Sequence, residues 1–366
     1  MIIKDIVAFL ETIAPTSLQE SYDNAGLIVG NAQQQCSGAV VCLDVTEAVL
    51  DEAIAHQYNL IIAHHPIVFT GLKKLNGKNY VERIVIKAIQ HNIALYAIHT
   101  NLDNVLQGVN AAIAAKLGLT NTQVLLPKNA ILQKLVVFVP QTHVSTLQEA
   151  LFKAGAGNIG HYSECSFTST GIGSFKPGDN TNPYIGTIGE RYTAEEVKLE
   201  VVFESWQQAN IVTAMVQNHP YEEVAYEIYT LQNTYQQIGS GLVGQLTTAI
   251  TETTLLALLG QQFNPHCIKH TQKTGKPIQK IALCGGAGSF LIAQAKAVGA
   301  DVYITADLKY HEFFDADNQL LLVDIGHYES EQFTIELLFE LLSNKFLNFA
   351  LLKTGVNTNP VQYFVP

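Results

Sequence analysis

The stretch Leu60-Ile61-Ile62-Ala63-His64-His65-Pro66 joins a short apolar run to a pair of histidines. The run Leu60–Ala63, which is β-branched in its middle, is typical of a buried strand. The proline that follows the histidines predicts that the strand ends there. Ligands bind beyond the carboxyl ends of the strands in open α/β sheets, so two imidazoles at this position favour a metal site. Taken alone, the two histidines are equally consistent with solvated loop residues.

The segments around this stretch alternate between predicted strands and helices. Ala39–Leu43 is an apolar strand, and Thr46 is the predicted N-cap of a helix over roughly 47–56. A helix near 80–90 and a strand at Ala94–Ile98 continue the pattern. A strand–helix–strand unit predicts parallel pairing with a right-handed crossover. We therefore expect an α/β fold.

The C-terminal part of the chain repeats this order of elements. The predicted elements are strands at Ile281–Cys284, Val302–Thr305 and Leu320–Asp324, a helix over Phe290–Val298, and a helix from about 326 to 342. In residues 39–65 and again in residues 280–307, the predicted order is a strand, a turn, a helix, a second strand and then a polar residue. This predicts two similar α/β half-units that face one site. The glycine-rich loop 285–289 lacks the lysine of a phosphate-binding loop, so close helix–strand packing is the expected reason for its glycines.

The middle of the chain has a different character. The predicted elements are strands at Leu135–Val139, Val197–Phe203 and Val224–Leu231, helices at Ser145–Lys153 and Trp206–Gln217, and a long irregular segment at Gly155–Tyr192. Two βαβ halves of this kind are typical of a ferredoxin-like α+β domain. We predict a discontinuous α/β domain of residues 1–127 and 240–366, interrupted by an inserted ferredoxin-like domain with its connector at 128–239.

Further polar residues follow the other predicted strands. Asp103 leaves the strand at 94–98, which places it at the same sheet edge as His64 and His65; alternatively, it caps a helix that begins near Val105. His327 and Glu331 are four residues apart, so both lie on one face of a first helical turn. The alternative for Glu331 is a carboxylate that only complements the helix dipole.

These groups predict a site for two metal ions. Its ligands would be His64, His65, Asp103, His327 and Glu331. Three imidazoles and two carboxylates are too many for one tetrahedral ion, but they suit two divalent ions that share a carboxylate and a bridging water. Zn, Fe, Mn and Co all accept this set of nitrogen and oxygen ligands. His99, Asp307 and His311 are candidates for ligand orientation or proton transfer, or else for structural hydrogen bonds.

The motifs together resemble the NIF-three-like di-metal family, whose members are named GTP cyclohydrolase 1 type 2 homologues. The matching stretches are Ser21-Tyr22-Asp23-Asn24-Ala25-Gly26, Ala63-His64-His65-Pro66, His99-Thr100-Asn101-Leu102-Asp103, and Gly326-His327 with Glu331. The resemblance covers residues 1–127 and 240–366 and implies a dinuclear site on the five ligands named above. Some relatives have a second histidine after the one at 327; Tyr328 stands there in this chain.

The middle segment resembles the PII/CutA-like insert that longer members of the family carry. The stretches 157–165 and His219-Pro220-Tyr221-Glu222-Glu223 carry this match. The resemblance further implies a ring-like homohexamer with the insert near the entrance of a central cavity.

The composition and charge of the chain argue against several classes of protein. The chain has 366 residues and a net charge of −11, which argues against a nucleic-acid partner because no basic stripe is present. Five cysteines without paired spacing do not form a disulfide framework and predict a reducing, cytoplasmic location. No apolar run is as long as a membrane span, and the first residues lack the apolar core of a signal peptide, so no membrane association is expected.

Two classes of function fit these features. The first is a dinuclear-metal-dependent hydrolase that acts on a nucleotide or related small molecule through a metal-bridging water; the resemblance adds a GTP cyclohydrolase type of reaction. The second is a non-catalytic, metal-binding regulatory assembly in which the insert senses a metabolite. A scaffold for a partner protein is a further alternative, which the acidic composition permits.

Overall fold

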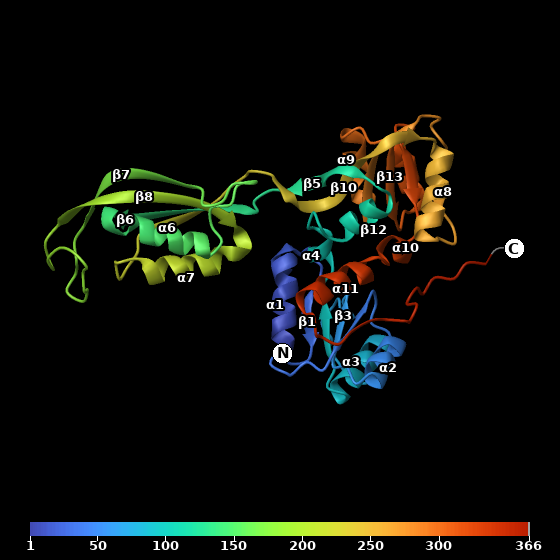
Figure 1. Ribbon diagram of the computed structural model, residues 1–366, viewed down its shortest axis with the longest axis horizontal. Helices are drawn as coiled ribbons and strands as arrows, with labels where there is room; N and C mark the ends of the chain where they lie inside the picture. The colour runs from blue at the N-terminus through green and yellow to red at the C-terminus, as the bar shows by residue number, and fades with distance from the viewer. Residues whose placement is uncertain (365–366) are drawn as a thin grey trace. The chain divides into compact units, whose positions relative to one another are not determined.

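The computed structural model describes residues 1–364, which fall into two compact units. Of these described residues, the first unit comprises 1–127 and 236–364, and the second comprises 128–235. Within residues 1–364 the architecture is mixed α/β with three sheets, in agreement with the predicted α/β class (Figure 1). No helix within residues 1–364 is long and apolar enough to span a bilayer.

The first sheet of the larger unit contains the central stretch of the sequence. Its elements are α1 (Ile3–Ile13), β1 (Gly26–Val29), β2 (Ala39–Cys42), α2 (Glu47–Ala55), β3 (Leu60–Ala63), α3 (Tyr80–Gln90), β4 (Ala94–Ala97), α4 (Thr100–Asp103), α5 (Val109–Lys116) and, near the C-terminus, β15 (Leu351–Lys353). The strand order is β1-β4-β3-β2-β15. The predicted parallel pairing of β2, β3 and β4 is confirmed, while β1 is antiparallel to β4.

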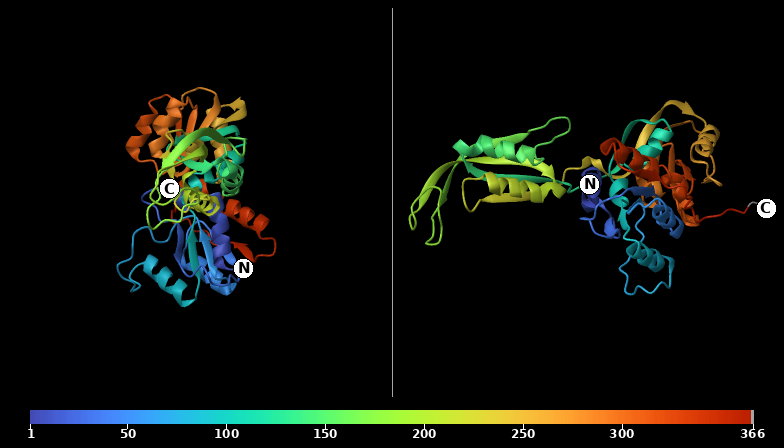
Figure 2. Two further views of the ribbon diagram at one scale, coloured as in Figure 1. Left: turned by 90° about the vertical axis from the view of Figure 1, so that its left-hand side faces the viewer. Right: turned by 60° about the horizontal axis from the view of Figure 1, so that its bottom comes forward.

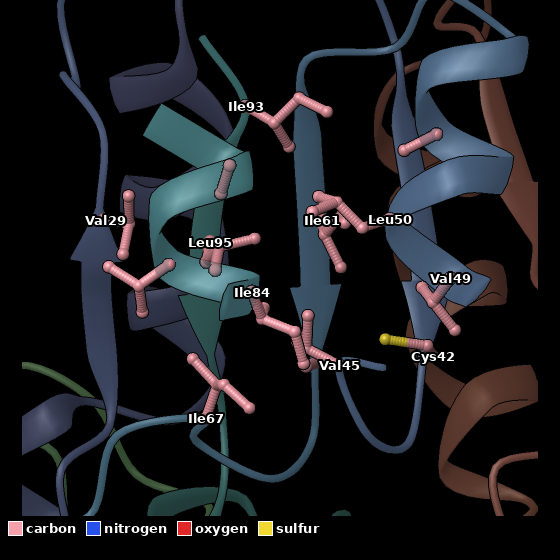
Figure 3. Packing of buried hydrophobic residues seen from close by; sticks show 14 of the residues in the cluster. Val29, Cys42, Val45, Val49, Leu50, Ile61, Ile67, Ile84, Ile93 and Leu95 are labelled. Atoms are coloured by element: carbon pink, nitrogen blue, oxygen red, sulfur yellow. The ribbon is translucent and has the colours of Figure 1, made fainter. Parts of the chain in front are cut away.

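Apolar side chains on both faces explain why β3 lies at the centre of this sheet. All four residues of β3 are fully buried, as expected for a parallel strand covered on both sides. Helices α2 and α3 pack together over one face, where Leu50 and Ile84 meet Ile61 and Leu95 (Figure 3). The Thr46 hydroxyl accepts a hydrogen bond from the backbone N–H of Val49, which confirms the predicted N-cap.

The second sheet of the larger unit is built around the C-terminal run of strands. Its elements are β5 (Thr120–Lys128), β10 (Tyr235–Ile250), α8 (Glu252–Phe263), β11 (Lys269–His270), β12 (Ile278–Ala287), α9 (Ile292–Ala297), β13 (Val302–Ala306), β14 (Leu321–Asp324), α10 (His327–Glu331) and α11 (Thr334–Lys345). The strand order is β11-β14-β13-β12-β10-β5. Strands β12, β13 and β14 are parallel, so their carboxyl ends point to one edge. Helix α11 reaches over to contact β2 and β15 of the first sheet.

The second unit is a four-stranded antiparallel sheet with two helices. Its elements are β6 (Leu132–Pro140), α6 (Val144–Lys153), β7 (Ser166–Phe175), β8 (Tyr192–Glu204), α7 (Gln208–Asn218) and β9 (Tyr226–Thr230), in the strand order β7-β8-β6-β9. Helices α6 and α7 lie side by side on one face of this sheet (Figures 1 and 2). Their buried partners are the inward-facing residues of β6 and β8, such as Val137 and Leu199.

Some expectations about local structure are wrong. No helix begins near Val105: Asp103 ends the short α4, and α5 begins at Val109, so Asp103 caps no following helix. The helix predicted from 326 to 342 is divided into α10 and α11, and Glu331 is the last residue of α10, not a first-turn residue. The irregular segment predicted at 155–192 contains β7, whose mostly exposed side chains give no apolar alternation.

Candidate metal centre

Strand ends from both sheets of the larger unit deliver the candidate ligands. His64 and His65 follow β3, and their backbone N–H groups donate to Cys42 and Leu43, which keeps both residues in line with the strand. Gly326 adopts a φ of +94°, a conformation that favours glycine, and turns the chain from β14 into α10. As a result, α10 presents His327 and Glu331 to the histidines that follow β3.

The Glu331 carboxylate lies at the centre of the cluster. Its Oε2 atom is 2.9 Å from Nε2 of His65 and 3.0 Å from Nε2 of His327. The two Nε2 atoms are themselves 3.3 Å apart. Donor atoms bound to one tetrahedral ion at ordinary bond lengths are separated by about 3.3 Å. The three side chains therefore already have nearly the mutual spacing that a shared ion requires.

His64 and Asp103 form the second part of the cluster. Nε2 of His64 is 3.6 Å from Oδ1 of Asp103 and 3.8 Å from Oε2 of Glu331. The opposite ring nitrogen of His64 is held by the carbonyl of Ile98, at 2.8 Å. Nε2 of His64 and Oδ1 of Asp103 are both buried without a hydrogen-bond partner. Because buried polar atoms are almost always paired, this orphaned pair fits a ligand that is a cation.

The electrostatics of the cluster point the same way. Burial and the charge of Glu331 raise the pKa of Asp103 well above its usual value. Burial lowers the pKa of His64 to about 3, so its imidazole is neutral. Burial opposes ionisation of Glu331, but His327 and His65 hold its pKa well below the usual value. A neutral imidazole beside two enclosed carboxyl groups is the donor set that divalent metals bind.

His65 and His327 are each oriented by a second carboxylate. Nδ1 of His65 is 2.7 Å from Oδ1 of Asp44, and Nδ1 of His327 is 2.7 Å from Oδ2 of Asp307. Burial alone would lower the pKa of His65, but its hydrogen bonds to Asp44 and Glu331 raise it to about 9. Burial would likewise lower the pKa of His327, but Glu331 and Asp307 raise it to about 11. A carboxylate on the far nitrogen fixes the ring and the tautomer of a metal-binding histidine.

His99 also lies at the cluster. The candidate ligand atoms of His64, His65 and His99 all lie within 4.8 Å of one another, and those of His65, His327 and Glu331 form a second such group. Nδ1 of His99 is 2.8 Å from Oδ1 of Asp23. Its ring is therefore anchored in the same way as those of His65 and His327. His99, which we predicted to act in orientation or proton transfer, also has the position of a candidate ligand.

The structure does not bring His311 to the cluster. It is exposed on a 3₁₀ helix over Tyr310–Ala316, where its ring lies near those of Tyr310 and Phe314. Asp307, four residues earlier, does reach the cluster through His327. Asp307 therefore lies at the cluster, whereas His311 does not.

Three further residues that support the cluster were not singled out as site residues from sequence. Asp44 orients His65, Asp23 orients His99, and the Thr358 hydroxyl donates to Oδ2 of Asp44 at 2.7 Å. Asp44 lies just beyond the end of β2, at the position that His65 has relative to the end of β3, so the same strand-end signal could have identified it. Thr358 lies in an irregular segment without periodicity, and no sequence signal marks it.

Glycines of β12 make room for the central carboxylate. Gly286 has a φ of +61°, and a Cβ there would lie 2.3 Å from Oε1 of Glu331. Its N–H donates to the Ser330 hydroxyl, which in turn donates to the carbonyl of His327. The close approach of α10 to β12 at Gly286 agrees with the expectation that these glycines serve close helix–strand packing.

A cleft of 1280 Å³ opens onto the cluster. His65, Asp103, His327 and Glu331 lie among the residues that line it. Exposed aromatic rings contribute to its walls, from Tyr22, Phe69, Tyr80, Phe290 and Tyr363. Among the described lining residues, Lys269 is the only lysine or arginine, and it is paired with Asp324 at 2.6 Å. The cleft is large enough for a small-molecule substrate.

Several known proteins are similar to this chain. A family model described as Duf34/NIF3 (NGG1p interacting factor 3) matches residues 1–360. A relative from Halalkalibacterium halodurans, named GTP cyclohydrolase 1 type 2 homolog, is 39% identical over 363 residues and the match covers 98% of both chains. A relative of the same name from Bacillus subtilis is 37% identical over 365 residues, again covering 98% of both chains. Among solved structures, a Bacillus cereus protein related to NIF3 has a TM-score of 0.85 at 37% identity and covers 100% of this chain and 99% of its own.

Proposed function

The chain belongs to the Duf34/NIF3 family, and from this premise and the geometry of the cluster we propose that it is a dinuclear-metal-dependent hydrolase. Its substrate would be a nucleotide or a related small molecule. The names of its relatives suggest a GTP cyclohydrolase type of reaction as the first one to test.

The observation that carries this proposal is the orphaned pair beside Glu331. Nε2 of His64 and Oδ1 of Asp103 are buried, unpaired and 3.6 Å apart. Oε2 of Glu331 is 3.8 Å from Nε2 of His64, 2.9 Å from Nε2 of His65 and 3.0 Å from Nε2 of His327. One carboxylate oxygen thus lies near both sets of candidate ligands, which supports two ions in preference to one.

Each residue has a role that its contacts support. His64, His65, Asp103, His327 and Glu331 would hold two divalent ions. When bound, such ions supply Lewis acidity and lower the pKa of a coordinated water.

The neighbouring residues position these ligands and handle protons. Asp44 and Asp307 keep Nε2 of His65 and of His327 directed at the cluster. His99 is held by Asp23 and has a ring nitrogen within 4.8 Å of those of His64 and His65, so it is placed to move a proton to or from a substrate. The aromatic rings at the cleft supply surfaces on which a flat base would stack.

Activity assays on the metal-loaded chain test this proposal. The protein would be loaded separately with Zn²⁺, Fe²⁺, Mn²⁺ and Co²⁺ and assayed for formate release from GTP and for hydrolysis of a panel of nucleotides and phosphoesters. Turnover that disappears in Glu331→Gln would support the hydrolase. If a fully metal-loaded protein turns over none of these compounds, the hydrolase proposal fails and the regulatory alternative gains.

The alternative is a metal-binding regulatory assembly, and one observation favours it. The 128–235 unit has a cavity of its own, of 410 Å³, to which none of the candidate metal ligands contributes. A metabolite bound there would make the insert a sensor. Stabilisation of the full chain by a ligand that is never turned over would support this function.

The arrangement of domains and subunits also belongs to this proposal. We propose that residues 128–239 form an inserted ferredoxin-like domain with its connector; the strand order β7-β8-β6-β9 supports this. We further propose a cytoplasmic homohexamer of the chain. Mass photometry would give the mass of six copies if this is right, whereas a monomer or dimer at micromolar concentration would contradict it.

A further inference from the structure

We propose that the 128–235 unit binds a small organic ammonium ion in its own cavity, between aromatic rings and the carboxylate of Glu196. The cavity has a volume of 410 Å³ and lies between the end of β7, the loop 176–185, β8 and the segment 221–225 after α7. All of its lining residues belong to this one unit. The proposed site is therefore separate from the metal cluster in both residues and chemistry.

The position of the cavity follows from the alternation of side chains along the strands. Val197 and Leu199 of β8 face the two helices in the core. Glu196 therefore points to the opposite face of the sheet, where no buried core competes for it. On that face Gly173 of β7 stands beside the carboxylate, and a Cβ at this glycine would lie 2.1 Å from Oε2 of Glu196. The absence of a side chain at Gly173 leaves the space that the carboxylate occupies.

Three aromatic rings, those of Phe175, Tyr184 and Tyr221, line the same cavity as this carboxylate. The ring of Tyr221 is 6.0 Å from that of Phe175 and 6.1 Å from that of Tyr184, and the planes meet at 56° and 46°. The three rings are thus inclined to one another and are not stacked in one pile. Several aromatic rings that line one cavity are the kind of surface on which proteins recognise quaternary and other alkylated ammonium ions.

Hydrogen bonds hold the walls in place. The Tyr221 hydroxyl donates to Oε1 of Glu196 at 2.9 Å, and the Tyr221 N–H donates to Nδ1 of the buried His219 at 3.1 Å. The backbone N–H of Asn182 donates to Glu222 at 2.8 Å, which ties the loop to the segment after α7. For Oε2 of Glu196, no hydrogen bond or ion pair is found among residues 1–364. One carboxylate oxygen therefore orients a ring while the other remains able to meet a ligand.

The charges at the cavity select the sign of the ligand. Glu196, Glu222 and Glu223 line it, against the single cation Lys176. Three carboxylates against one ammonium group disfavour a phosphate or carboxylate ligand and attract a cation. A metal ion would require several donors that converge on one point, and among the described residues no three His, Cys, Asp or Glu side chains of this cavity do so. An organic cation with an apolar surface satisfies both the rings and the carboxylate.

Titration calorimetry with a charged probe and its neutral isostere tests this proposal on the full chain. Choline is the charged probe, tetramethylammonium is a second one, and 3,3-dimethyl-1-butanol has the shape of choline without the charge. We expect choline to bind with a Kd at or below about 1 mM, and the neutral alcohol to bind at least about ten-fold more weakly. If neither cation binds, or if the alcohol binds as well as choline, the proposal is wrong.

Variants assign the binding to this cavity. Glu196→Gln removes the charge but keeps an acceptor for Tyr221, and should weaken choline binding about ten-fold. Tyr184→Leu replaces an exposed ring by an apolar side chain of similar reach and should also weaken it several-fold. Glu195→Gln is the matched control, because Glu195 is exposed, is adjacent on β8 and does not line the cavity. If Glu195→Gln weakens choline binding as much as Glu196→Gln does, choline binds elsewhere and the assignment fails.

Discussion

The Nε2 atoms of His65 and His327 lie 3.3 Å apart, although 262 residues separate the two histidines in the sequence. One follows a strand of the first sheet and the other begins a helix that follows the second sheet. Oε2 of Glu331 contacts both rings. The cluster therefore exists only when both sheets of the larger unit are folded and packed together, so its metal content reports on the whole unit.

Removing a ligand should remove metal. His64→Ala and Glu331→Ala delete one candidate ligand each, and Glu331 lies beside both sets of ligands. We expect both variants to retain well under half of the metal of the parent, with the larger loss for Glu331→Ala. His311→Ala is the control, because this exposed histidine lies outside the cluster. Elemental analysis would give the stoichiometries, and unchanged metal in Glu331→Ala would reject the assignment.

Metal binding should release protons. In the metal-free protein the pKa of His65 is about 9 and that of His327 is about 11, since the hydrogen-bonded carboxylates outweigh burial. Both rings are therefore protonated at pH 7, and a metal ion must displace those protons. We expect at least two protons released per chain at pH 7 and a metal affinity that rises with pH up to about 11, the pKa of His327. Calorimetry in buffers of different ionisation enthalpy would count the protons.

The same two histidines predict the pH dependence of stability without metal. Their folded-state pKa values lie above the ordinary value of 6.5. The stabilisation is therefore complete below pH 6.5, and it is lost as the pH rises through about 9 for His65 and about 11 for His327. Thermal unfolding of the metal-free protein should show a falling Tm between pH 7 and 10, and a Tm that rises over this range would contradict the charge arrangement.

The carboxylate behind His65 should tune the affinity of the site. Asp44→Asn removes the negative charge from Nδ1 of His65 and should weaken metal binding about ten-fold or more. Thr358→Val removes the hydroxyl that donates to Asp44 and should have a smaller effect in the same direction. Thr354→Val is a matched control from the same segment, because that hydroxyl donates to Glu52 instead. Competition with a chelator would rank the variants, and equal effects of the two threonine changes would rule out the role of Thr358.

A methyl group at Gly286 should push Glu331 out of place. A Cβ there would lie 2.3 Å from Oε1 of Glu331, whereas a Cβ at Gly299 would meet nothing within 4 Å. Both glycines have positive φ, so alanine at either position should cost about 1 kcal/mol in backbone strain. Only Gly286→Ala should also lose metal. Comparable metal content in the two variants would show that Glu331 has room to move.

Much of the cluster could be predicted because its signals are local. Strand β3 was confirmed at the predicted residues, and the spacing of His327 and Glu331 is a helical period. The strand-end rule then brings residues from distant parts of the sequence to one edge. Asp44 obeys the same rule, but a single aspartate after a strand is commonly only a turn residue, so its position alone does not mark it as part of a site.

Other features could not be predicted because they depend on packing. Thr358 reaches Asp44 only because β15 returns the chain to β2, a pairing that no sequence pattern announces. Strand β7 was missed because its side chains are largely exposed, so apolar alternation is absent. The path of the chain after β13 exposes His311 on a 3₁₀ helix, which its spacing from Asp307 does not reveal.

The most direct measurement is anomalous X-ray scattering from crystals of protein purified without added metal. If the central claim is right, two anomalous peaks per chain will lie within about 4 Å of each other, one beside His64 and Asp103 and the other beside His65 and His327, with Glu331 touching both. A single peak, or peaks remote from Glu331 in a protein that elemental analysis shows to contain metal, would contradict a dinuclear centre built from these residues.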